Sequence, residues 1–472
     1  GQSRLAGVCA TRRGGGRVTS AVRPKTGVSR PYAFPATTRF ALGNGLRVVV
    51  APMPRLPLVS VLAVVDAGAA GDGCGHEGLA MLTAMALAEG AAARNGPALA
   101  EAFERLGTGI ESGAGWDDAI VQLTVTPARL DDALALLADV LVAPRFAEGD
   151  VARLKAERLA ELLQERVEPR ALADERFARA VYDESSRYSR AAGGTPASVR
   201  ALDVAHVRAW HDARYNGATT TIIVAGDVTP ERVRDIVERR LGAWSRPALP
   251  MAAVVVSGRS RVTRVHVVAK ADAPQSELRI GHVGLPRAHG DYFPAVVLNA
   301  VLGGLFSSRI NLNLREVHAY TYGAHSAFDW RRAAGPFVVG TAVKTEVTDA
   351  AVREILLEID RIREAEVSTD ELELSTKYLG GVFPIRYETT GAVASALAMA
   401  TIYGLNDDYF DTYGERIAAV TSADVLAAAR AHLHPDALQI VAVGDAAAIE
   451  GPLAALRLGE LMVTSADEGD GA

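Results

Sequence analysis

His76 and Glu77 form the first half of a zinc-binding pattern. In H-E-x-x-H, two histidines one helical turn apart hold the ion and the glutamate acts as general base. Ala80 stands where the second histidine is needed, and the pair lies in a glycine-rich stretch. The other nine histidines form no His-x3-His pair. We therefore predict that His76 and Glu77 are surface residues without a metal.

Residues 78–90 are predicted to form a helix with the spacing of an inverted zinc motif but none of its ligands. In H-x-x-E-H, two histidines and a glutamate share one helix face, where they bind zinc and take a proton from water. Met81, Ala84 and Met85 occupy the corresponding positions. None of these side chains is a usual zinc ligand and none can act as a base. We therefore expect no metal in this chain.

Other catalytic and binding classes lack the residues that they need. Ser307 and Ser308 have no acid and base nearby in sequence, and Gly303-Gly304 lacks the third glycine and preceding strand of a dinucleotide site. Cys9 and Cys74 are too few for a disulfide framework. A net charge of -6 gives no basic field for nucleic acid. No apolar run reaches the ~20 residues of a membrane span.

The length and composition predict a chain of several domains in which helices pack on sheets. The 472 residues exceed one typical core, and 49% are hydrophobic with only 6% aromatic. Ten Lys and Arg precede the first acidic residue, Asp66. This composition predicts a basic flexible tail over 1–34, although it also resembles a transit peptide. The sequence does not fix the cellular compartment, but we favour a bacterial periplasm over the cytoplasm.

Alternating strand and helix patterns predict an α+β fold. Apolar runs on both sides of Gly43-Asn44-Gly45 are typical of a hairpin. Further strands are expected at 59–66, 119–125 and 219–225, and further helices at 97–106, 127–142, 149–167, 170–183 and 203–214. Strand pairs followed by helix pairs favour largely antiparallel or mixed sheets with helices on one face.

An internal repeat predicts that the domain is duplicated. Residues 202–227 align with 420–445 without a gap at an offset of 218, and both end in a buried strand followed by Gly-Asp. This period is too long for a solenoid. We predict an amino-terminal domain over 35–245, a proline-containing linker over 246–260, a carboxy-terminal domain over 261–462 and an acidic tail over 463–472.

Several spaced motifs in the second half resemble the pitrilysin/insulinase family of zinc peptidases, which includes the mitochondrial processing peptidases and bacterial two-subunit enzymes. The resemblance extends over roughly 35–460 and rests on Pro274-Gln275-Ser276, Gly281-His282, Leu298, Gly303 to Arg309, Leu314-Arg315-Glu316 and Tyr320-Thr321-Tyr322. It implies two related α+β domains per subunit, with two subunits closing around a chamber.

The resemblance also implies two sites that must meet, of which this chain retains one. The first is the zinc motif with a later glutamate as third ligand. That motif is lost here, and Glu157 and Glu161 lie near the position of the glutamate. We expect Glu161 to be a solvated or salt-bridged helix residue. The second is an arginine seven residues before a tyrosine, and it is intact as Arg315 and Tyr322.

Within this resemblance, Arg315 and Tyr322 are the predicted catalytic and substrate-binding residues. A guanidinium offers five fixed donors to peptide carbonyls at any working pH. A phenol on the strand that is expected to follow can donate to the oxygen that gains charge as water attacks. Tyr320 remains an alternative if the strand register differs by two.

We therefore predict a non-catalytic subunit of a heteromeric zinc metalloendopeptidase, inactive alone. Its partner would be a similar chain with an intact H-x-x-E-H helix that carries the zinc, and extended peptides would be the substrates. The main alternative is a catalytically silent scaffold or peptide-binding protein of the same fold. An independent peptidase with another metal site is a third possibility.

Overall fold

The computed structural model describes residues 32–245, 247, 254–258 and 260–466. The chain divides into two units, Gly1–Tyr32 and Ala33–Ala472, and the described helices and strands belong to the second. Nearly all of the predicted basic tail lies outside the described residues, as does much of the predicted linker.

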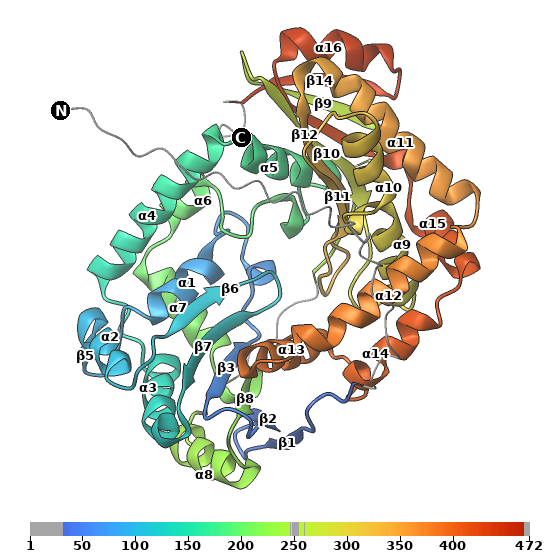
Figure 1. The fold of residues 1–472 in the computed structure, drawn as a ribbon. Helices are drawn as coiled ribbons and strands as arrows, with labels where there is room; N and C mark the ends of the chain where they lie inside the picture. Colours follow the sequence, from blue (N-terminus) through green and yellow to red (C-terminus); the bar gives the residue numbers. More distant parts are fainter. Residues whose placement is uncertain (1–31, 246, 248–253, 259, 467–472) are drawn as a thin grey trace, which may run out of the picture. The chain divides into compact units, whose positions relative to one another are not determined.

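The first half of the chain builds a six-stranded mixed sheet in the order β1-β2-β8-β3-β7-β6 (Figure 1). Strands β2 and β8 run parallel, and the other neighbours are antiparallel. The hairpin predicted around Asn44 joins β1 to β2, as expected. The strands are β1 (Thr38–Ala41), β2 (Arg47–Pro52), β3 (Val59–Val65), β6 (Glu111–Ala114), β7 (Ala119–Val125) and β8 (Thr220–Gly226).

The second half builds another six-stranded sheet, in the order β11-β12-β10-β13-β9-β14. Strands β13, β9 and β14 run parallel to one another, and the other neighbours are antiparallel. Because β14 ends at Ser465, the folded part continues past the predicted boundary at 462. The strands are β9 (Arg264–Ala269), β10 (Gln275–Val283), β11 (Ala324–Phe328), β12 (Pro336–Lys344), β13 (Gln439–Gly444) and β14 (Glu460–Ser465).

The two sheets confirm the predicted duplication. The order β2-β8-β3-β7-β6 corresponds to β9-β13-β10-β12-β11, with the same strand directions. Ile222 pairs in parallel with Val48, and Ile440, its partner in the sequence repeat, pairs in parallel with Val265. Only the sixth strand differs, since β1 runs antiparallel to β2 whereas β14 runs parallel to β9.

Helices of the same half cover one face of each sheet, as predicted. In the first half, apolar side chains of four helices share one core with the strands: α1 (Leu79–Leu87), α3 (Leu130–Val142), α7 (Val204–Arg214) and α8 (Pro230–Leu241). In the second half, the covering helices are α9 (Tyr292–Asn299), α11 (Thr348–Glu364), α15 (Ser422–His432) and α16 (Ala446–Ala455).

The opposite face of each sheet is covered by a helix from the other half, which the sequence did not predict. Helix α5 (Pro169–Val181) packs on β10 and β13, and α13 (Thr390–Tyr403) packs on β3 and β8 (Figure 1). Phe177 of α5 shares a core cluster with Val441 and Val443. The buried hydroxyls of Ser60 and Thr390 lie 2.9 Å apart. The halves therefore share their interiors.

One described segment, 292–317, is long and apolar enough to cross a membrane by length and composition. Half of its most apolar window is buried inside the protein, as in the core helix of a globular domain. The segment also breaks at Leu305, whose backbone is extended between two helical turns. It is therefore a core segment of the second half.

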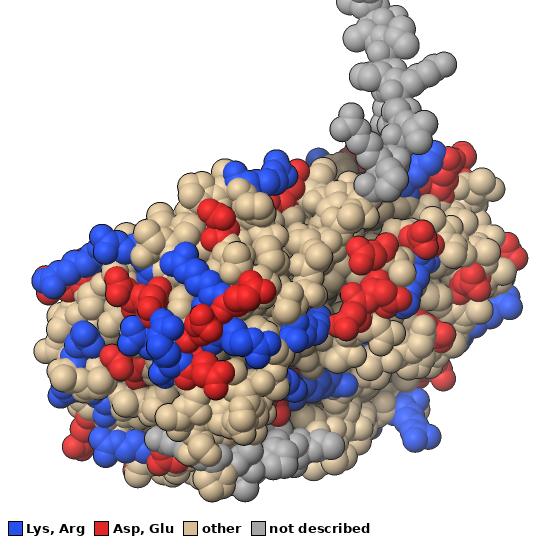
Figure 2. All heavy atoms as spheres, turned by 90° about the horizontal axis from the view of Figure 1, so that it is seen from below, with Lys and Arg blue, Asp and Glu red and all other residues tan. Residues whose placement is uncertain are grey.

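Side chains of both signs are interspersed on the face seen in Figure 2. Basic and acidic side chains lie close to one another there over the described residues, so positive and negative fields largely cancel at short range. This distribution agrees with the net charge of -6.

Candidate functional site

Helix α1 carries the positions of the lost zinc motif. A buried carboxylate accepts hydrogen bonds from backbone N–H groups at its start. Gly78 is its N-cap residue, with a φ of +95° that glycine adopts readily. Asp72 accepts hydrogen bonds from the N–H of Gly78 at 2.8 Å and of Ala80 at 2.9 Å. Arg187 forms a buried ion pair with Asp72 at 3.1 Å. Burial raises the pKa of Asp72 to about 6, although Arg187 opposes the shift.

The raised pKa of Asp72 predicts a stability contribution that is fully present below about pH 4 and is lost as the pH rises through about 6. The carboxyl group of Asp72 binds its proton more tightly in the folded state than in the unfolded state. A difference of roughly two pKa units corresponds to about 3 kcal/mol. We therefore expect the wild type to lose about 3 kcal/mol relative to Asp72→Asn between pH 4 and 7. Urea unfolding of both proteins across this range measures it, and a pH-independent difference would contradict the shift.

An arginine occupies the surroundings of the former ligand positions. Met81 and Met85 line a cavity of only about 10 Å³ together with Arg158 of α4 (Glu148–Val167) and Gly193. The Nε of Arg158 donates to the carbonyl oxygen of Gly193 at 3.2 Å. Ala84 is fully buried. A permanent positive charge therefore lies beside the positions that correspond to the zinc motif.

Glu161 is exposed and salt-bridged, as predicted. Its carboxylate lies 3.0 Å from Arg158, which also bonds Glu165, and Glu157 pairs with Arg153. An exposed pair of this kind contributes at most about 1 kcal/mol. We therefore expect Glu161→Gln to change the free energy of unfolding by less than about 1 kcal/mol. We also expect the variant to bind the same amount of zinc as the wild type. A loss of bound zinc in this variant, measured by metal analysis, would show that Glu161 is a ligand.

Glu77 was wrongly predicted to lie on the surface. Its side chain is buried and forms an ion pair with Arg190 at 3.5 Å, and its backbone oxygen accepts a hydrogen bond from Ser198. His76 contacts His206, with the two rings tilted and 4.7 Å between their centroids. The pair therefore stabilises the loop before α1.

Arg315 lies in a π-helical turn, η6 (Leu312–Val317), that follows the short helix α10 (Arg309–Asn311). Its guanidinium lies 4.4 Å from the ring centroid of Phe306. The Nε atom lies 3.6 Å from Glu316. The buried Nη1 atom has no hydrogen-bond partner among the described residues. Arg315 therefore retains an unused donor.

Tyr322 lies on a loop and not on the strand that was predicted to follow Arg315. Strand β11 begins at Ala324, where the side chain of Asn311 accepts the backbone N–H. Before it, Ala319 has a positive φ of 54° and Gly323 bonds the hydroxyl of Thr321, so the chain turns. The side chain of Tyr322 is 94% exposed. No contact between Tyr322 and Arg315 is formed within the described chain.

Tyr320, unlike Tyr322, is partly buried and packs on a neighbouring ring. Its backbone N–H donates to the carbonyl oxygen of Leu314, and its ring stacks on His318 at 4.9 Å. Because these residues form a loop, the alternation of a strand does not relate Tyr320 to Tyr322. Of the two tyrosines, Tyr322 is the more exposed.

Large apolar side chains surround Arg315 in sequence and are exposed. Phe306 is 70% exposed and Val317 73%, and Leu312 is also exposed. The contact between Phe306 and Arg315 brings part of this group together. We use the name 306–322 segment for the stretch that carries the exposed side chains of Phe306, Leu312, Val317 and Tyr322. Clustered apolar side chains of this kind are typical of a surface that another molecule covers.

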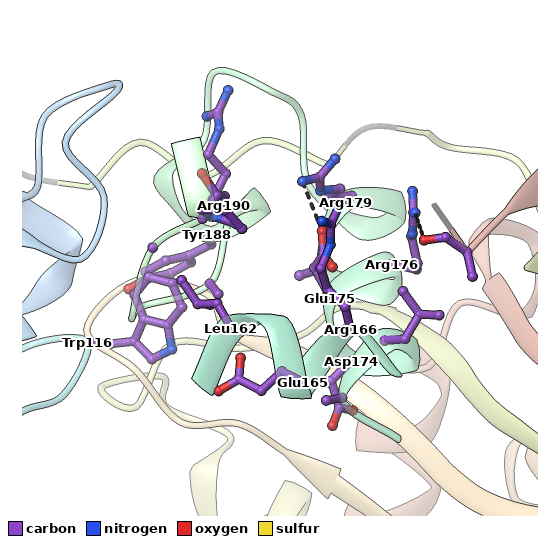
Figure 3. A pocket seen from close by; sticks show the side chains of 18 of the residues that line it. Trp116, Leu162, Glu165, Arg166, Asp174, Glu175, Arg176, Arg179, Tyr188 and Arg190 are labelled. Atoms are coloured by element: carbon purple, nitrogen blue, oxygen red, sulfur yellow. Dashed lines mark hydrogen bonds and ion pairs between the residues drawn. The ribbon is translucent and has the colours of Figure 1, made fainter. Parts of the chain in front are cut away.

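A separate cavity lies where α4, α5 and the second half meet (Figure 3). It measures about 350 Å³. Arg331 lies over the rings of Trp116 and Tyr188, at 4.3 and 4.4 Å. Arg179 pairs with Glu175 on its wall. These residues are far apart in sequence and form no motif, so sequence reasoning missed the cavity. Neither Arg315 nor Tyr322 lines it.

Two family models match consecutive parts of the chain. The model for insulinase, peptidase family M16, matches residues 47–191. The model described as the peptidase M16 inactive domain matches residues 201–379, which include Arg315 and Tyr322. The chain belongs to the M16 peptidase family. This confirms the resemblance that was inferred from the spaced motifs.

Curated relatives of this M16 chain are similar over most of their length. An uncharacterized zinc protease of Streptomyces coelicolor is 23% identical over 89% of this chain and 92% of its own. An uncharacterized zinc protease of Mycobacterium tuberculosis is 24% identical over 86% of this chain and 93% of its own.

Solved structures share the fold of this M16 chain. The crystal structure of a peptidase M16 inactive domain from Pseudomonas fluorescens has a TM-score of 0.81 at 25% identity, covering 86% of this chain and 98% of that one. A protease from Helicobacter pylori also has a TM-score of 0.81, at 16% identity over 87% of this chain and all of that one. The match to the inactive domain, together with the zinc protease relatives, supports a non-catalytic M16-like subunit.

Proposed function

We propose that this M16 chain is the non-catalytic subunit of a heteromeric zinc metalloendopeptidase and that Arg315 and Tyr322 act on a peptide held at the partner's zinc site. The observation that carries the proposal is the exposure of Tyr322, which is 94% exposed in a segment of exposed apolar side chains. A buried or internally bonded phenol could not reach a substrate. Met81, Ala84 and Met85 are not zinc ligands, which supports the proposal that another chain carries the zinc.

The two side chains supply complementary chemistry. The partner's zinc provides the activated water. The guanidinium of Arg315, whose side chain is about one-third exposed, donates to a backbone carbonyl of the peptide and holds the chain in place. The hydroxyl of Tyr322 donates to the carbonyl oxygen that becomes negatively charged as water attacks. Extended peptides suit this arrangement, because β6 and β11 lie at sheet edges where a further strand can pair.

A second exposed apolar group supports a partner surface beside this segment. Helix α12 (Thr369–Arg386) presents Leu374, Tyr378 and Ile385, which are 52%, 48% and 65% exposed. They are spaced four and seven residues apart and so share one helix face. Arg309 binds Glu371 of this helix with two hydrogen bonds of 2.6 and 2.9 Å. The pair anchors the start of α12 to the beginning of the helical turn that carries Arg315.

The test is to assemble the chain with a similar chain that carries H-x-x-E-H and to measure zinc on the partner's helix. We expect a stable pair with one zinc on the partner's helix, and this zinc is lost when the partner's two histidines are replaced by alanine. A scaffold or peptide-binding protein, the alternative function, would form its assembly without zinc at that helix. An assembly without such zinc would therefore contradict the proposed function.

A further inference from the structure

Three side chains that can bind a metal meet in the second half, far from the lost zinc motif in sequence. His289 and Asp291 lie before α9, and His432 is the last residue of α15. Their ligand atoms all lie within 4.8 Å of one another. The Nε2 of His432 lies 2.7 Å from a carboxylate oxygen of Asp291, and the Nδ1 of His289 lies 3.9 Å from the same oxygen.

The backbone holds the three side chains in place. Helices α9 and α15 pack against each other. The N–H of His289 donates to the carbonyl of Pro286 at 3.0 Å, and that of Tyr292 donates to the carbonyl of His289 at 3.1 Å, which closes a tight loop. Asp291 is the N-cap residue of α9, but within the described chain its carboxylate makes no capping bond and instead contacts His432.

We propose that His289, Asp291 and His432 bind a transition-metal ion of the zinc class. Two imidazoles and one carboxylate are a donor set that zinc prefers, whereas magnesium and calcium prefer oxygen ligands alone. Zinc bonds of about 2.0–2.2 Å place neighbouring ligands of a tetrahedral site roughly 3.3 Å apart. The 2.7 and 3.9 Å separations lie on either side of this value. Small side-chain rotations would therefore complete the site.

The exposure of the three residues fits a bound ion with one open position. The side chain of His432 is 11% exposed, that of His289 36% and that of Asp291 51%. The ion is thus reachable from solvent, and water can fill the fourth position. The N–H of Asp291 donates to the Nδ1 of His289 at 3.1 Å, so His289 either gives up this bond or binds through Nε2. The ion would tie the loop before α9 to the end of α15.

The test is a zinc titration of the chelator-treated full chain by calorimetry, with thermal unfolding in parallel. We expect one equivalent to bind and the thermal midpoint to rise with zinc concentration. His432→Ala should weaken binding at least about tenfold. Asp291→Asn, which nearly keeps the size and shape of the side chain, should do the same.

The matched control is His206→Ala. His206 also lies 2.7 Å from an aspartate, Asp203, and contacts a second histidine, His76, but these three do not meet as ligands among the described residues. We expect this variant to bind zinc as the wild type does. Loss of binding in His206→Ala with retention in His432→Ala would overturn the proposal, and so would the absence of stoichiometric binding to a folded wild-type chain.

Discussion

Replacing Tyr322 with phenylalanine is expected to lower the rate of peptide cleavage by the assembled pair about 10²–10³-fold. The change removes one hydroxyl and keeps the ring. Because Tyr322 is 94% exposed and bonds no described residue through its hydroxyl, the fold should not change. The loss should appear in kcat, since the hydrogen bond strengthens as charge develops on the oxygen. Single-turnover kinetics of the assembled pair measure this step.

Tyr320→Phe is the matched control for this prediction. Tyr320 lies two residues away on the same loop, but its ring stacks on His318. We expect this variant to cleave peptide at the wild-type rate. If Tyr320→Phe is slow and Tyr322→Phe is not, the oxyanion donor is Tyr320. Wild-type rates in both variants would contradict a catalytic role for the loop.

Replacing Phe177 with alanine is expected to lower the free energy of unfolding by about 3–5 kcal/mol and to destabilise both halves together. Phe177 is 5% exposed and lies in the core that α5 shares with β13 of the other half. Its ring reaches the strand beside Gly281, where an added Cβ would lie 3.0 Å from the ring. Urea unfolding gives the total loss, and hydrogen exchange gives the protection of β3 and β10 separately.

Leu163→Ala is the control for the effect of a lost apolar side chain. Leu163 belongs to the neighbouring helix α4 and is 54% exposed, so its removal should change stability by less than about 0.5 kcal/mol. In Phe177→Ala, faster exchange should appear in both sheets. If β3 kept its wild-type protection while β10 lost its own, the halves would be independent domains.

Local sequence patterns predicted most strands of the first half, and the repeat predicted the duplication, because each pattern reports on a short stretch. The turn at Asn44-Gly45 marks the first hairpin, and the strand predicted at 119–125 has the same bounds as β7. Such patterns could not predict that α5 and α13 each cover the sheet of the other half. The apolar faces of these helices, which include Phe177 and Val393, are the same whichever sheet they cover.

The candidate site was predicted in its residues but not in its geometry. The spacing of Arg315 and Tyr322 is a property of the sequence, whereas the loop depends on Asn311, which binds the first N–H of β11 across 13 residues. The role of Arg158 also depends on tertiary contacts, since it joins α4 to the loop at Gly193. A helical pattern alone indicates only that such an arginine is part of a polar face.

The most direct measurement of the central claim is the rate of peptide cleavage by this chain alone, by its H-x-x-E-H partner alone and by the mixture. The account predicts that the mixture cleaves an unfolded peptide in a chelator-sensitive reaction and that neither chain does so alone. Chelator-sensitive cleavage by this chain alone, or a mixture no faster than the partner alone, would contradict it.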